Sequence, residues 1–211
     1  MPLLKYVLNE AKKELEKKGR IREEAQTDMR FVINRSKQAI LQIHQKKMQK
    51  AKKLIQEASE ITKKLETTSN KHAELIYGGF YSAALQEYSE ANIFLNLIER
   101  QEFVAPKEIN VPAADYVLGL ADVIGEYRRL TLDYLREGNV KKGDECLQIM
   151  DEIFTELMTL DETLLVSGLR RKNDVARKII EITRGDITQE TRISTFEEHL
   201  KHLEKRIEKK E

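Results

Sequence analysis

The feature that most limits the folds open to this chain is the absence of proline over its first half. Of the 211 residues, only positions 2, 106 and 112 are proline. A proline inside a helix costs about 3 kcal/mol, because it removes a hydrogen bond and clashes with the preceding turn. The stretch 3–105 can therefore hold long helices. Its apolar residues follow helical spacing, as in the run Leu4, Leu8, Ala11 and Leu15.

Glycine and polar clusters divide the chain into expected helices. Gly19 predicts a kink or break, the TTSN sequence at 67–70 predicts a turn, and Gly185 predicts a helix end. After a first helical stretch, helices are expected over about 46–66, 71–100, 112–137, 140–160 and up to 185, followed by a helical tail. No convincing alternating segment indicates a strand. The sequence thus predicts an all-α bundle of about six or seven helices. It forms one domain over 1–211, with a C-terminal helical extension from about residue 186.

Composition excludes several classes of protein. Hydrophobic residues make up 40% of a chain whose net charge is +1, which is too apolar for a disordered protein. Cys146 is the single cysteine, so no intrachain disulfide can form; it is expected to be a small buried hydrophobe in a reducing compartment. The start resembles no signal peptide, and no run of about 18 uncharged apolar residues could span a membrane. A cytoplasmic location is expected.

Two glutamates occupy the seam of the helix expected over 71–100. The seam consists of Ile76, Phe80, Ala83, Glu87, Glu90, Phe94 and Leu97. Burying an unpaired carboxylate is costly, so a seam glutamate needs a cation or a wet cavity beside it. Glu87 and Glu90 therefore mark this helix as a candidate site.

The helix after Pro112 carries a second pair of acids. It is apolar almost all round, which predicts burial. Its one polar stripe consists of Asp115, Gly119, Asp122, Glu126 and Arg129. Asp122 and Glu126, four residues apart, share one helical face, as Glu87 and Glu90 do.

If these two helices are neighbours, four carboxylates can converge. Like charges at such distances repel each other unless they are protonated or bound to metal, and hard oxygen ligands suit Mg²⁺ or Mn²⁺. Two such ions, about 3.5–4 Å apart, can activate water for phosphodiester hydrolysis. The alternative is that the acids pair with Arg128, Arg129 or lysines at a subunit surface. The spacing leaves both explanations open.

These segments resemble the translin family, and within it the branch of translin-associated factor X (TRAX), in a prokaryotic or archaeal form. The resemblance is carried by LQEYSEA at 85–91, AADYVLGLADVIGEYRRL at 113–130 and GLRRKNDVARKIIE at 168–181. It implies an all-α fold, a closed oligomer (typically an octamer), single-stranded RNA or DNA held inside, and metal-dependent endoribonuclease activity. By the same resemblance Glu87, Glu90 and Asp122 would be Mg²⁺ ligands, and Glu126 a fourth ligand or the base that orients water.

Nucleic-acid contacts are expected away from the acids. The family often has a basic stretch before its first acidic motif, but residues 76–80 (IYGGF) are not basic here. The expected contacts are therefore Arg20, Arg22, Arg30 and Arg35 on the first long helix, with Arg129 on the polar stripe. Because one chain carries both acids and basic helices, a homo-oligomer without a second subunit type is expected.

Three functions are consistent with these residues. The first is a metal-dependent endoribonuclease that cleaves single-stranded RNA inside an oligomer. The second is a single-stranded RNA- or DNA-binding protein without catalysis, in which the acids are structural. The third is an all-α nucleotide pyrophosphohydrolase, which also holds Mg²⁺ with an E-x-x-E motif and a second acidic pair.

Overall fold

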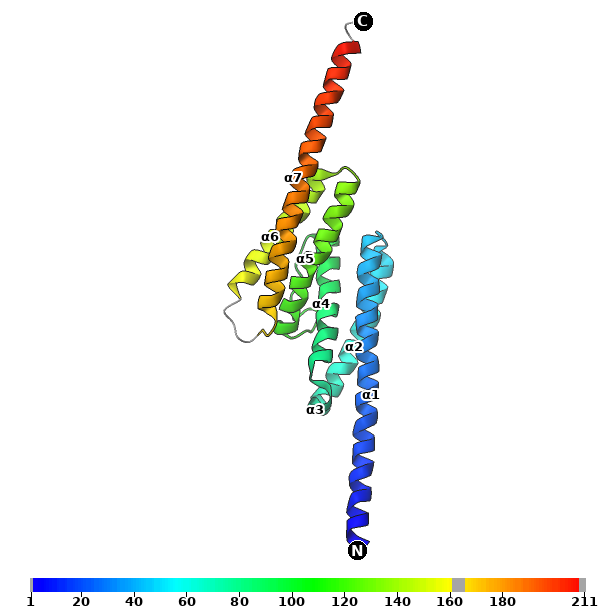
Figure 1. Ribbon diagram of the computed structural model, residues 1–211. Coiled ribbons are helices and arrows are strands. Elements are labelled where there is room, and N and C mark those ends of the chain that lie inside the picture. The colour runs from blue at the N-terminus through cyan, green and yellow to red at the C-terminus, as the bar shows by residue number, and fades with distance from the viewer. Residues whose placement is uncertain (1, 161–165, 209–211) are drawn as a thin grey trace. The chain divides into compact units, whose positions relative to one another are not determined.

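A computed structural model describes residues 2–160 and 166–208, and these ranges are helical nearly throughout. They contain no strand and seven helices: α1 (Pro2–His44), α2 (Met48–Lys71), α3 (Ala73–Ile76), α4 (Gly79–Arg100), α5 (Ala113–Arg136), α6 (Val140–Thr159) and α7 (Leu169–Glu208) (Figure 1). The predicted all-α fold is confirmed. None of the described helices has a segment apolar enough to cross a bilayer.

Three of the predicted breaks are wrong. Gly19 lies inside α1, residues 67–70 lie inside α2, and Gly185 lies inside α7. A single glycine costs a helix only about 1 kcal/mol, which a long helix tolerates. In the TTSN segment, the hydroxyls of Thr67 and Thr68 each donate at 3.0 Å to the carbonyl four residues earlier. These side chains therefore bond along the helix and do not cap a new one.

One break was missed. The helix expected over 71–100 is divided into α3 and α4, with Gly78 and Gly79 at the start of α4. Two consecutive glycines double the conformational cost of a continuous helix. Phe80, expected on the buried seam, is consequently in the first turn of α4 and 39% exposed.

The chain forms two compact units, residues 1–119 and 120–211. The boundary falls within α5, and the single-domain organisation stays a prediction. In the first unit, α1 packs along α2 and α4 (Figure 1). Fully buried alanines such as Ala39, Ala58 and Ala91 line this packing. The Phe94 ring of α4 is also fully buried, and its centroid lies 5.1 Å from that of the His44 ring of α1. Small side chains allow the helix axes to approach closely.

Gly119 marks a close approach between α4 and α5 within the first unit. A Cβ atom added there would lie 2.6 Å from the Gln86 carbonyl oxygen and 2.7 Å from the Ser89 Cβ atom. The start of α5 therefore runs almost in backbone contact with α4. Only glycine leaves room for this spacing.

In the second unit, polar bridges join the helices around an apolar core. The Arg128 guanidinium of α5 donates to the Thr183 hydroxyl at 2.7 Å and to the Asp186 carboxylate at 2.9 Å, both on α7. On α6, Cys146 is buried as predicted, and burial raises the pKa of its thiol to about 11. Its ordinary role is that of a small apolar side chain.

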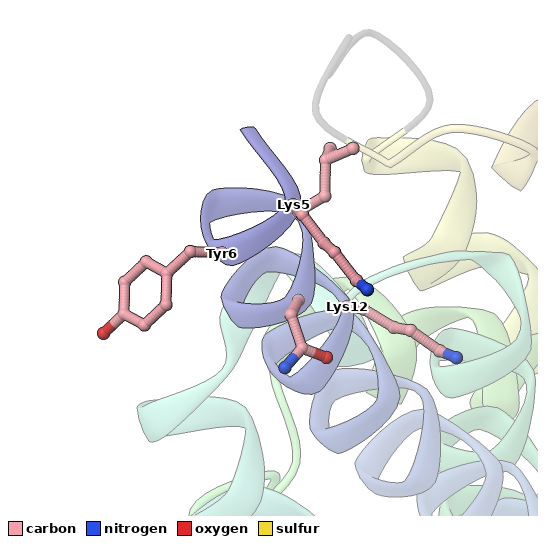
Figure 2. A pocket seen from close by; sticks show the side chains of 5 residues that line it. Lys5, Tyr6 and Lys12 are labelled. Atoms are coloured by element: carbon pink, nitrogen blue, oxygen red, sulfur yellow. The ribbon is translucent and has the colours of Figure 1, made fainter. Parts of the chain in front are cut away.

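The first turns of α1 extend beyond the packed part of the first unit (Figure 1). Every described side chain from residue 3 to residue 17 is exposed, including Leu4, Leu8 and Leu15. Figure 2 shows a hollow on this segment, whose lining residues all belong to α1, with Tyr6 pointing away from Lys5 and Lys12. A hollow on a single helix encloses nothing, so it is not a site.

Candidate functional site

The first acidic pair lies on α4 in the first unit. The Glu87 carboxylate forms an ion pair of 3.0 Å with the Lys37 ammonium of α1, and the Glu87 side chain is 25% exposed. Glu90, almost one turn further along α4, is buried at 8% exposure. One acid is thus accessible and balanced by a lysine, and the other is drawn into the packed interior.

A polar chain that the sequence did not reveal links α4 to α5 in the same unit. The Ser82 hydroxyl donates to the Asp115 carboxylate, and the Gln86 amide donates to the Ser82 oxygen at 2.9 Å. Burial raises the pKa of Asp115, and its hydrogen bonds from Ser82 and Gln86 oppose that rise. Sequence reasoning placed Asp115 on the polar stripe but had no signal for the serine opposite it.

The second acidic pair lies on α5 in the second unit. The Asp122 carboxylate accepts a hydrogen bond from the Lys172 ammonium in the first turn of α7. The Glu126 carboxylate lies 3.9 Å from the Arg129 guanidinium. Arg128, considered above as a partner for the acids, is instead bound to Thr183 and Asp186.

These contacts define how well the acids suit a metal ion. Carboxylate oxygens are the donors that Mg²⁺ prefers, so the donor type fits. Among residues 2–160 and 166–208, however, no three His, Cys, Asp or Glu side chains gather closely enough to hold a metal ion. Glu87 and Asp122 each face a lysine, and metal binding would require those lysines to give way.

Some of the basic residues predicted to bind nucleic acid already form ion pairs with other residues that the structure describes, and others do not. Arg20, Arg22 and Arg30 are exposed, and no ion pair involves them in the described part of the chain. They do not share a face, because Arg20 and Arg22 lie about 200° apart around the helix. Arg35 is held by the Glu57 carboxylate at 2.9 Å and lies over the Phe31 ring. Arg129 is exposed beside Glu126.

The architecture is that of an all-α protein whose acidic pairs lie on α4 and α5. Comparison with known proteins defines it further. A sequence model of the Translin family matches residues 10–205, and the chain belongs to that family. It is also 31% identical, over 206 residues, to an uncharacterized protein of Methanocaldococcus jannaschii, across 97% of this chain and 90% of that one.

Solved structures agree with this assignment. The chain superposes with a TM-score of 0.78 on AfC3PO in complex with duplex RNA, at 34% identity, covering 87% of this chain and 96% of that chain. Apo-NeC3PO matches with a TM-score of 0.79 over the same shares, at 22% identity. The second likeness concerns the fold alone.

Proposed function

We propose that this protein binds RNA and cleaves it in a Mg²⁺- or Mn²⁺-dependent reaction, as a TRAX-like member of the translin family. The observation that carries the binding half is the likeness to AfC3PO, a protein 34% identical over nearly its whole length and solved with duplex RNA. The cleavage half is supported by the two acidic pairs and by the resemblance of their sequences to the TRAX branch.

The roles proposed for the acids follow from that resemblance and from their contacts. Glu87, Glu90 and Asp122 would hold the metal, and Glu126 would be a further ligand or the base that orients a water molecule. A bound divalent cation would supply a more acidic water and charge stabilisation for the leaving oxygen. In the absence of the metal ion, Lys37 neutralises Glu87 and Lys172 neutralises Asp122. Each ion pair holds its partly buried carboxylate in a defined position.

The proposal extends to the assembly. A closed homo-oligomer, with the octamer as the expected form, would enclose the strand without a second subunit type. Single-stranded RNA is the proposed substrate, and single-stranded DNA is proposed as a second ligand. Comparing single-stranded with duplex RNA in the same assay tests this preference directly.

The deciding experiment incubates the purified protein with labelled single-stranded or duplex RNA, in Mg²⁺ or in EDTA. Glu87→Gln and Asp122→Asn are compared with two control variants of matched environment. Glu99→Gln also lies on α4, pairs with Lys52 at 2.9 Å and is 22% exposed at its side chain, against 25% for Glu87. Asp133→Asn also lies on α5 and is 37% exposed, against 39% for Asp122.

Each outcome decides between the candidate functions. Cleavage that needs the metal, is lost in Glu87→Gln and Asp122→Asn, and survives in both controls supports the proposal. RNA that is retarded but intact leaves a binding protein with structural acids. Hydrolysis of free nucleoside triphosphates without RNA cleavage would indicate a pyrophosphohydrolase, and no RNA binding at all would reject both halves.

A further inference from the structure

A groove of about 230 Å³ lies between α5 and α7 in the second unit. Its α5 wall includes Ala121, Asp122 and Gly125, and its α7 wall includes Arg171, Lys172 and Ala176. The space exists because small residues stand on both helices. A Cβ atom added to Gly125 would meet nothing within 4 Å. The small side chains therefore leave an open groove, and Asp122, Arg171 and Lys172 place charged groups along its walls.

The charges at the groove are unbalanced. Arg171 and Lys172 contribute two positive charges and Asp122 one negative charge. Asp122 is bound to Lys172, whereas no hydrogen bond or ion pair involves Arg171 in the part of the chain that the structure describes. The groove thus has one surplus cation, an arginine whose planar guanidinium matches the oxygens of a phosphate.

The position of these cations argues against a purely structural role. They stand in the first turn of α7, which contains no acidic residue. The amino end of a helix carries a partial positive charge, so basic side chains there destabilise the helix. An anion in the groove would relieve this repulsion, and it would give Arg171 a partner, which none of the residues described in the structure provides.

We infer that this groove binds one phosphodiester group of an RNA strand, with Arg171 and Lys172 as its donors; the identity of the strand rests on the proposed function. Pockets that enclose a whole small-molecule ligand usually measure about 300–1,000 Å³. A smaller groove fits one phosphate of a longer chain better than a complete nucleotide. When the phosphate binds, it competes with Asp122 for Lys172 and loosens that ion pair.

Asp122 and the strand are thereby coupled through one lysine. Asp122 is a carboxylate that the proposed reaction needs, and Lys172 holds it in the absence of RNA. When a strand is present, its phosphate would take over Lys172 and release the Asp122 carboxylate from the ion pair. Without a strand, the ion pair would stay intact. Lys172 acts here as a positioning residue.

The test measures binding of a labelled single-stranded RNA by fluorescence anisotropy, in EDTA so that no cleavage occurs. Arg171→Gln is compared with Arg170→Gln, which removes the same charge from the same exposed turn but does not line the groove. We expect Arg171→Gln to weaken binding about tenfold, as for a lost charge-assisted hydrogen bond. It should also lower the slope of log affinity against log salt by about 0.7, the value for one phosphate of a single strand. Arg170→Gln should change the affinity much less.

Two further variants test the groove without removing a cation. Gly125→Leu fills the open space and should weaken binding by a similar factor. Asp122→Asn removes the competitor for Lys172 and should strengthen binding in EDTA several-fold. Asp133→Asn removes the same charge from α5 outside the groove and should not produce that gain.

The outcomes separate this inference from the proposed function. If the unmodified protein does not bind RNA, the proposed function fails. If it binds RNA but Arg171→Gln and Arg170→Gln are indistinguishable, only the groove assignment fails. Competition by ATP and by inorganic phosphate identifies the source of the phosphate. If Arg171→Gln weakens ATP binding and leaves RNA binding unchanged, a strand is excluded as the occupant.

Discussion

Replacing Gly119 by alanine tests the contact between α4 and α5 directly. The new methyl group would lie 2.6 Å from the Gln86 carbonyl oxygen and 2.7 Å from the Ser89 Cβ atom. Ordinary non-bonded contacts between carbon atoms are about 3.5–4.0 Å, so the two helices would have to separate by nearly 1 Å. The first obstacle is backbone, which no side-chain rotation can move.

The magnitude follows from two opposing effects. Overpacking of this kind costs about 1–3 kcal/mol, and the backbone contact places Gly119→Ala at the upper end. Alanine recovers about 1 kcal/mol of helix propensity. The free energy of unfolding should therefore fall by about 2 kcal/mol. For a chain of this size, at about 2–4 °C per kcal/mol, the midpoint of thermal unfolding should fall by about 4–8 °C.

Gly125→Ala is the matched control, because it makes the same change in the same helix where a Cβ atom meets nothing within 4 Å. It should stabilise the protein by about 0.5–1 kcal/mol. Urea unfolding followed by far-ultraviolet circular dichroism measures both variants. Equal stabilities for Gly119→Ala and Gly125→Ala would refute the close approach of α4 and α5.

Three other predictions concern titration and charge. Burial raises the pKa of Asp115, so its ionisation opposes folding, and stability is lost as pH rises from about 4 through the folded-state pKa. In Asp115→Asn, the free energy of unfolding measured in urea should depend less on pH over that window. An unchanged pH dependence would contradict the raised pKa of Asp115. The Cys146 thiol, with its pKa of about 11, should react with a thiol reagent at pH 8 only after denaturant is added, and rapid reaction of the native protein would disprove its burial. Lys37→Gln should lower the Mg²⁺ concentration needed for half-maximal RNA cleavage, because Lys37 competes with the metal for Glu87; a higher requirement would count against Glu87 as a ligand.

The sequence predicts the helices well where the pattern is long and poorly where a single residue decides. Helical spacing and missing prolines predict α5 and α6 to within about one residue at each end. The errors at Gly19 and Gly185 arise because one glycine is a small local cost, whereas packing of a long helix is a large and distant gain. At Gly78 and Gly79 a break should have been predicted, because the helix-propensity costs of two adjacent glycines add up.

The acidic stripes were visible in the sequence because helical periodicity reveals which residues share a face. Their partners were not, since ion pairs between helices depend on tertiary packing. Glu87 is 50 residues from Lys37, and Asp122 is 50 residues from Lys172. The groove beside Lys172 was equally hidden. Its signal is the basic first turn of α7, which can be recognised only when the helix start is known.

The exposed first turns of α1 have a consequence for measurement. Residues 3–17 pack against nothing else in the described chain. Their helical backbone is supported by neighbours on the same helix, such as the Tyr6 hydroxyl, which donates to Glu10 at 2.9 Å. A helix of that length alone in water opens at little free-energy cost. Its amide protons should therefore exchange with solvent far faster than those of the rest of α1. Any slowing of that exchange as protein concentration rises would report, without a label, that another molecule has covered the segment.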